Sequence, residues 1–104
     1  MRMLMKVEIP TETGNEAFKN GSFIKAVQEV LGKVQPEAAY FTTVDGRRGG
    51  YVIFDLRDVR KIPSISEPLF LALGANVEFT PCFTAQELEQ AGPDIQKAVQ
   101  TYGS

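Results

Sequence analysis

The feature that most constrains how this chain can fold is the order in which its apolar residues change their spacing. Within residues 2–9, apolar side chains occupy every second position on one face, as in a half-buried strand. Between residues 23 and 34 they recur at helical spacing. Residues 38–44 are rich in aromatic and β-branched side chains, which favour a second strand. The first half of the chain is therefore predicted to run strand, helix, strand.

The second half of the chain repeats this order. Residues 51–56 alternate as a third strand, residues 69–73 form a nearly continuous apolar run that indicates a helix, and residues 77–83 alternate as a fourth strand. Strand, helix, strand, strand, helix, strand is the order of a ferredoxin-like α+β sandwich. We therefore predict that two helices cover one face of a four-stranded sheet.

A chain of 104 residues, 43% of them hydrophobic, suits a single domain with one modest core. We predict one ferredoxin-like domain over residues 1–104, with a core at 1–83 and a C-terminal helical tail at 84–104. The run from Thr84 to Glu87 matches a capping box, so a helix is expected to start there. Gly92-Pro93 predicts a break between two tail helices.

Glycine and proline residues predict where the earlier elements begin and end. Pro10 to Asn15 is expected to turn the chain, and Gly21 to break the start of the first helix, which leaves Phe18 to face a partner. Asp45-Gly46 predicts a tight hairpin, with Gly49-Gly50 leading into the next strand.

The second helix and the fourth strand carry similar signals. Ser66 is expected to cap the helix, Pro68 to lie in its first turn, and Gly74 to end it. Because this helix is short and almost entirely apolar, we expect it to be buried on more than one side. Pro81 favours an edge position for the fourth strand.

Composition excludes several classes of function. Eleven basic and thirteen acidic residues give a formal charge of -2, which argues against a nucleic-acid-binding surface. Cys82 is the only cysteine and there is no histidine, so neither a disulfide framework nor a metal or other cofactor site is expected. Arg2, Lys6 and Glu8 interrupt the first apolar segment, which excludes a signal peptide or membrane span there. We expect a cytoplasmic protein.

The sheet face opposite the helices is the surface from which we predict a homodimer. Strand alternation assigns one set of residues to the helix side, Met5, Val7, Phe54, Val77 and Phe79. It assigns a second set to the open face, Leu4, Lys6, Glu8, Tyr40, Thr42, Val44, Tyr51, Ile53, Asp55, Glu78, Thr80 and Cys82. Five of these, Leu4, Tyr40, Val44, Tyr51 and Ile53, would form an exposed apolar patch that is unusual for a monomer. Pairing of two open faces would cover the patch and close a dimeric α+β barrel.

Four short runs give the chain a resemblance to a known group of proteins, namely Pro36–Phe41, Asp45–Gly49, Glu67–Phe70 and Val77–Pro81. In these runs the chain resembles an uncharacterised bacterial family of the dimeric α+β barrel superfamily. It is more distantly similar to the muconolactone isomerases, YCII-like proteins and quinol monooxygenases of that superfamily. The resemblance implies a ferredoxin-like fold, a homodimer and a cavity between sheet and helices. The His-Asp pair of YCII-like proteins has no counterpart, because the chain has no histidine.

Asp55 is the candidate general base, since it lies on a central strand whose open face also carries Tyr40 and Tyr51, and desolvation there would disfavour its charged form. The alternative is that Asp55 forms an ion pair with Lys6, Arg48 or Arg57.

Four other positions are weighed in the same way. Arg47 and Arg48 could bind an anionic ligand at the barrel mouth, or be solvated turn charges. Glu67 could be functional, or simply oppose the helix dipole. Cys82 is interpreted as a small hydrophobic residue rather than a nucleophile. The predicted ligand-binding set is Tyr40, Arg48, Tyr51, Asp55 and Glu67.

Three functions remain open at the level of sequence. The first is a homodimeric barrel that binds a small organic molecule in its cavity. The second is a cofactor-independent isomerase or monooxygenase acting on such a molecule. The third is a protein interaction module that uses the tail helix.

Overall fold

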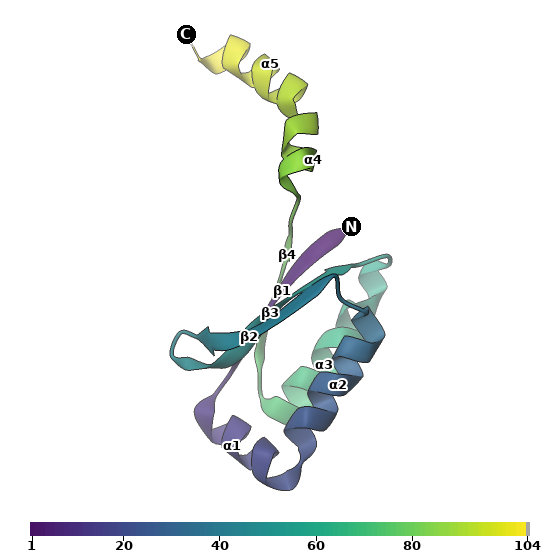
Figure 1. The fold of residues 1–104 in the computed structure, drawn as a ribbon, viewed down its shortest axis with the longest axis vertical. Helices are drawn as coiled ribbons and strands as arrows, with labels where there is room; N and C mark the ends of the chain where they lie inside the picture. The colour runs from purple at the N-terminus through teal and green to yellow at the C-terminus, as the bar shows by residue number, and fades with distance from the viewer. Residues whose placement is uncertain (104) are drawn as a thin grey trace.

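The computed structural model describes residues 1–103 and contains one four-stranded sheet, five α-helices and a short 3₁₀ helix (Figure 1). In chain order the elements are β1 (Arg2–Ile9), α1 (Thr11–Asn20), α2 (Ser22–Val34), β2 (Ala38–Val44), β3 (Arg47–Asp55), η1 (Val59–Lys61), α3 (Ile62–Leu73), β4 (Asn76–Pro81), α4 (Ala85–Gln90) and α5 (Gly92–Tyr102).

The sheet has the strand order β2-β3-β1-β4, and every neighbouring pair is antiparallel. β1 lies between β3 and β4, with Met5 opposite both Val52 and Phe79. Helices α2 and α3 pack side by side against one face of the sheet (Figure 1). The prediction of an α+β sandwich with a four-stranded sheet is confirmed, and the order of elements is consistent with a ferredoxin-like fold.

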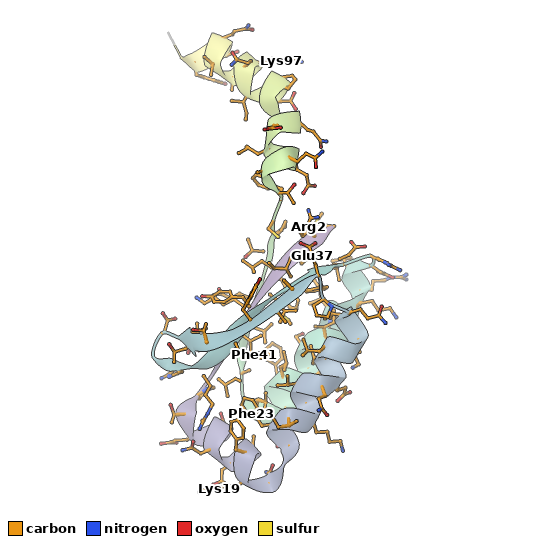
Figure 2. All side chains as sticks on the ribbon, viewed as in Figure 1. Arg2, Lys19, Phe23, Glu37, Phe41 and Lys97 are labelled. Atoms are coloured by element: carbon orange, nitrogen blue, oxygen red, sulfur yellow. The ribbon has the colours of Figure 1, made fainter. Side chains whose placement is uncertain are left out.

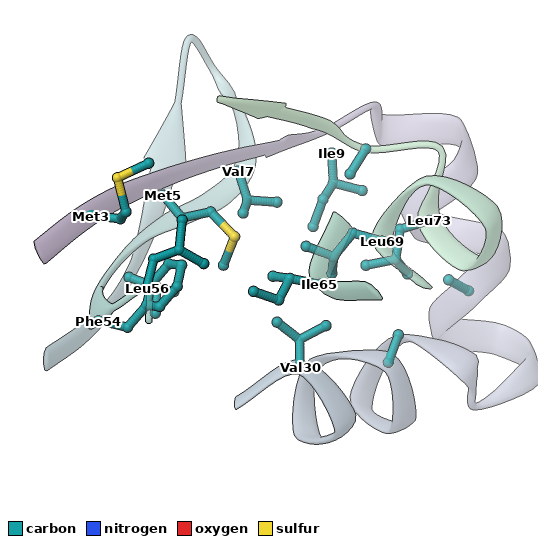
Figure 3. Packing of buried hydrophobic residues seen from close by; sticks show 14 residues of the cluster. Met3, Met5, Val7, Ile9, Val30, Phe54, Leu56, Ile65, Leu69 and Leu73 are labelled. Carbon is teal, nitrogen blue, oxygen red and sulfur yellow. The ribbon is translucent and has the colours of Figure 1, made fainter. Parts of the chain in front are cut away.

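The core lies between the sheet and its helices (Figure 3). β1 presents alternate side chains to it, so that residues 3, 5, 7 and 9 are buried while their neighbours are half-exposed. Three side chains are almost fully enclosed, namely Met5, Phe54 and Leu73. The rings of Phe54 and Phe79 meet edge to face, with centroids 6.3 Å apart.

The expected turn at Pro10–Asn15 is wrong, because helix α1 begins immediately after Pro10. The Gly14 N–H donates to the Pro10 carbonyl at 2.9 Å, and Gly14 and Ala17 are buried. Sequence patterning missed this helix because its buried residues are small. The predicted break at Gly21 is confirmed, since this residue has φ 81° and separates α1 from α2. Phe18 stacks on Phe23 of the same chain, with ring centroids 4.0 Å apart.

The predicted hairpin is confirmed, with positive φ at both Asp45 and Gly46, as a type I′ turn requires. Strand β3 nevertheless begins at Arg47, so the expectation that Gly49-Gly50 only leads into the strand is wrong. A Cβ atom added at Gly49 would lie 2.2 Å from the carbonyl oxygen of Val7. A Cβ atom added at Gly50 would lie 2.4 Å from the carbonyl oxygen of Tyr40. Glycine is therefore required where β3 approaches both of its neighbours closely.

Helix α3 starts at Ile62, four residues before the predicted cap. Ser66 lies inside the helix and donates its hydroxyl to the Ile62 carbonyl at 2.9 Å, so its predicted capping role is wrong. Pro68 is also interior and has no N–H to offer the Ser64 carbonyl one turn earlier. Lys33 of α2 donates to that carbonyl at 2.9 Å and satisfies it.

The predicted end of α3 is confirmed, because Gly74 has φ 60° and forms its C-cap. The expectation that this helix is buried on more than one side is wrong. Leu73 is fully buried, but Leu71 is 83% exposed and Phe70 is 41% exposed. An apolar run of this length is therefore consistent with a helix that leaves one apolar side uncovered.

β4 is an edge strand, as Pro81 predicted, and the tail leaves from its end. The capping box of Thr84 and Glu87 is present, and the two tail helices are separated at Ala91. Neither helix has a buried residue. The tail projects away from the sandwich (Figure 1). The radius of gyration is accordingly 17.4 Å, against about 13 Å for a compact chain of this length.

Arg2 is the link between the sandwich and the tail. Its guanidinium forms an ion pair with Glu37 at 3.0 Å (Figure 2). It forms a second ion pair with Glu87 of the capping box. The Arg2 carbonyl also accepts a hydrogen bond from the Cys82 N–H at 3.1 Å. These contacts fix the direction in which the tail leaves the sheet, although no tail side chain packs into the core.

Two leucines of α3 test this division into a buried and an exposed side. Leu73→Ala should lower the free energy of unfolding by about 2–5 kcal/mol, because it opens a cavity in the core. Leu71→Ala should change it by less than about 0.5 kcal/mol, as for other exposed positions. Urea denaturation of both variants provides the comparison. Equal losses would contradict the exposed position of Leu71.

Candidate functional site

The open face of the sheet carries the side chains that strand alternation assigned to it. Tyr40 pairs with Tyr51 across β2 and β3, and Lys6 lies between Tyr51 and Glu78. In the next row Leu4 lies between Ile53 and Thr80. The face thus combines apolar rings and aliphatic groups with a few charges.

Val44 departs from the expected exposed patch. It is buried, and its Cγ2 atom lies 2.8 Å from where a Cβ of Gly49 would be. The absence of a side chain at Gly49 gives Val44 the space it occupies. The patch therefore consists of Leu4, Tyr40, Tyr51 and Ile53.

Asp55 lies at the end of β3, apart from the two tyrosines. It is four positions from Tyr51 along the chain, which corresponds to about 13 Å in a strand. One carboxylate oxygen accepts from the amino group of Met1 at 2.8 Å, and the other from Arg57 Nε at 3.4 Å. Of the three ion-pair partners considered for Asp55, the structure forms the one with Arg57.

The electrostatics of Asp55 are opposite to those expected of a general base. The hydrogen bond and charge of the Met1 amino group hold the pKa of its carboxyl below the ordinary value of 3.8, and Arg57 adds to this effect. Desolvation acts in the expected direction and raises the pKa, but the interaction with the Met1 amino group outweighs it. The sequence could not reveal the contact with Met1, which joins positions 54 residues apart.

Glu67 and Cys82 lie apart from these residues and from each other. Glu67 is on the exposed side of α3, while Cys82 is half-buried just after β4. The structure therefore brings together only Tyr40 and Tyr51 of the predicted ligand-binding set.

A groove of about 550 Å³ lies between α1, α2 and the sheet. It includes three phenylalanines that sequence reasoning did not combine: Phe18 from α1, Phe23 from α2 and Phe41 from β2. Figure 2 labels Phe23 and Phe41. Gly50 lies opposite both Phe41 and Val7 in the row of the sheet that faces the groove. A side chain at position 50 would occupy part of this space, so its absence helps to leave the groove open.

Arg48 is the charged residue of the groove lining. Its guanidinium lies over the Phe18 ring, 4.9 Å from the centroid, and donates to the Asn15 side-chain oxygen at 2.9 Å. Arg48 thus belongs to the helix side of the sheet, opposite the face that carries Tyr40 and Tyr51. Arg48 is therefore separated from Tyr40 and Tyr51 by the thickness of the sheet.

A second depression, of about 490 Å³, lies at the other end of α2 and includes Asp55 in its lining. Its charges largely compensate one another, since Arg57 pairs with Asp55 and Lys33 contacts Glu29 and the Ser64 carbonyl. We therefore regard the apolar groove as the candidate site.

The described part of the chain also limits the chemistry available. Within residues 1–103 no three His, Cys, Asp or Glu side chains gather closely enough to hold a metal ion. None of the helices described is long and apolar enough to cross a membrane.

No protein-family model and no curated protein sequence matches this chain.

The Asp55 contacts make a specific prediction about pH. Its carboxyl should titrate below 3.8 in the folded state, which carboxyl-carbon NMR can measure. Because this pKa is lowered on folding, the charged form stabilises the fold above the unfolded-state pKa, and this contribution is lost as the pH falls through the folded pKa. Arg57→Met should leave the pKa lowered, since the Met1 amino group is the larger cause. A midpoint at or above 3.8 in the wild type would contradict the ion pair.

Proposed function

We propose that this protein is a homodimeric α+β barrel protein that binds a small organic molecule in the groove between α1, α2 and the sheet. The observation that carries the proposal is an apolar groove of about 550 Å³ that the chain's own side chains leave unfilled. This volume falls within the range of about 300–1,000 Å³ for ligand pockets in proteins. The resemblance to dimeric α+β barrels supports the same reading.

The composition of the groove supports a ligand with a large apolar part. Only Gln28, Thr42, Thr43 and Arg48 contribute polar side chains to its lining. When a ligand removes the apolar side chains of a concave surface from water, the free energy of the system falls. Few polar groups are then needed to orient the ligand.

The exposed side chains of the open face support the dimer. Tyr40 is 65% exposed, and its neighbours Leu4, Tyr51 and Ile53 are only half-buried. Pairing of two such faces would remove these groups from water and form a two-fold symmetric contact.

A 104-residue chain with one cysteine and no disulfide suits a reducing compartment such as the cytoplasm.

A second candidate function is a protein interaction module, which the tail favours. Leu88, Ile95, Val99 and Tyr102 are all about half-exposed or more. In our proposal they pack against the second copy of the chain, beyond the sheet from which they extend. In the alternative they bind a different protein, and the groove has no ligand.

Ligand binding is tested by filling the groove. A thermal-shift screen of small organic compounds should find one that stabilises the wild type, by about 2.7 kcal/mol at a hundredfold excess over its Kd. Val27→Trp should abolish this stabilisation, because Val27 lines the groove. Val59→Trp is the matched control, since Val59 is 69% exposed and outside the groove. A compound that stabilises Val27→Trp as strongly as wild type would show that it binds elsewhere.

The dimer is tested by mass. Light scattering at micromolar concentration should give about twice the 11.5 kDa of one chain. Ile53→Asp should raise the dissociation constant about 100-fold or more, because it buries an unpaired charge between the sheets. Ile95→Asp should also weaken the dimer if the tail packs on the second copy, whereas Val59→Asp should not. A single-chain mass for the wild type would refute the assembly.

A further inference from the structure

Arg48 differs from the other arginines of the chain in its partners. All five arginines lie within the described residues 1–103, and four of them form ion pairs with carboxylates. Its sequence neighbour Arg47, for example, contacts Glu8 at 2.8 Å. Within this part of the chain no carboxylate forms an ion pair with Arg48, whose side-chain partner is the neutral amide of Asn15. The positive charge of Arg48 is therefore not compensated by an ion pair.

The Arg48 guanidinium is nevertheless held in place. It stacks over the Phe18 ring and donates to Asn15, both on α1. Gly14 completes this arrangement, because a Cβ at that position would lie 2.9 Å from Arg48 Nη1. A guanidinium fixed by a ring and one hydrogen bond has further N–H groups with which to bind a ligand. Little conformational entropy would be lost when it does so.

The position of this charge relative to the groove suggests the chemistry of the ligand. Among the described residues that line the groove, Arg48 is the one with a charged side chain, and no Asp or Glu opposes it. The remainder of the lining includes Phe18, Phe23 and Phe41. One guanidinium beside aromatic rings fits one carboxylate attached to an apolar group. The amide of Asn15 accepts from Arg48 through its oxygen, which leaves its NH₂ group as a second donor.

We infer that the groove binds an amphipathic monocarboxylate, with its carboxylate on Arg48 and its aromatic or aliphatic part among the three phenylalanines. This inference rests on the proposed function, because it requires the groove to be the ligand site. The ligand inferred here is an anion, whereas the proposed function requires only a small organic molecule. Arg48 is the residue that selects between an acid and its neutral analogue.

Three naphthalene probes of the same shape separate these claims. Isothermal titration at constant ionic strength would compare 2-naphthoate, 2-naphthylmethanol and 2-naphthylmethylammonium. The wild type should bind the carboxylate about 10- to 100-fold more tightly than the alcohol, as expected of a charge-assisted hydrogen bond. It should bind the ammonium compound more weakly than the alcohol, because Arg48 repels it.

Substitutions of Arg48 then test the residue itself. Arg48→Met should reduce the preference for the carboxylate to less than about 3-fold while leaving the affinity for the alcohol unchanged. Arg48→Lys should keep part of the preference, since it retains the charge but loses the planar fork. Arg60→Met is the matched control and should behave as wild type, because Arg60 pairs with Asp58 outside the groove. An unchanged preference in Arg48→Met would overturn the inference.

The same titrations distinguish failure of this inference from failure of the proposed function. If carboxylate and alcohol bind equally well to the wild type, and Val27→Trp weakens both, the groove is the site but Arg48 does not select an acid. If no probe binds, or Val27→Trp has no effect on binding, the groove is not the site and both claims fail. If Ile95→Asp raises the affinity for the acid and the alcohol alike, the tail of a second copy occupies the groove, which would also overturn the inference.

Discussion

The pairing of β1 with strands on both of its sides is the interaction on which the rest of the structure depends. β1 is in register with β3 over eight residues and with β4 over six. This register assigns Met3, Met5, Val7 and Ile9 to the core and their neighbours to the open face. A shift of one residue would exchange the two faces, so burial of the core fixes the register. The groove and the proposed dimer surface lie on opposite sides of the sheet for this reason.

The two glycines of β3 connect sheet geometry to function. At positions 49 and 50, a Cβ would collide with backbone carbonyls of β1 and β2, respectively. Close approach of the strands therefore requires glycine, and glycine leaves no side chain on either face. On the open face the vacant position accommodates Val44. On the helix side, Gly50 faces the groove, with Val7 and Phe41 as its neighbours in the sheet.

Much of the fold could be predicted from the sequence because it depends on local patterns. Alternation identified three of the strands, and the aromatic and β-branched residues of 38–44 identified β2. The hairpin at Asp45-Gly46 and the end of α3 at Gly74 were expected from their residue types, and all three residues have positive φ. Helix α1 was missed because it buries only Gly14 and Ala17, which produce no apolar stripe. Ser66 has the residue type of a cap, but packing of Ile65 and Leu69 extends α3 past it.

The candidate site was harder to predict because it depends on contacts between distant segments. Phe18, Phe41 and Arg48 come from three elements, and each taken alone is an ordinary surface residue. Two signals were available in the sequence. Phe41 falls on the helix side of its strand, and Phe18 falls outside the stripe of the first helix. Asp55 and Tyr51 were correctly placed on one face, but strand rise separates them. Periodicity identifies a shared face, and does not show which residues on it are in contact.

The tail provides the strongest physical argument that the chain acts in an assembly. α4 has six residues and α5 has eleven, and isolated helices shorter than about 12–15 residues are only marginally stable in water. The capping box and the Arg2 contact stabilise the first turn alone. Burial of its apolar side in the proposed dimer would supply free energy that keeps α5 helical. Burial of one such side chain contributes about 1.5–3 kcal/mol, and Ile95 and Val99 remain about half-exposed in the single chain. Arg2 directs the tail away from its own sandwich. In the proposed dimer, the second copy would supply the surface that buries the apolar side of α5.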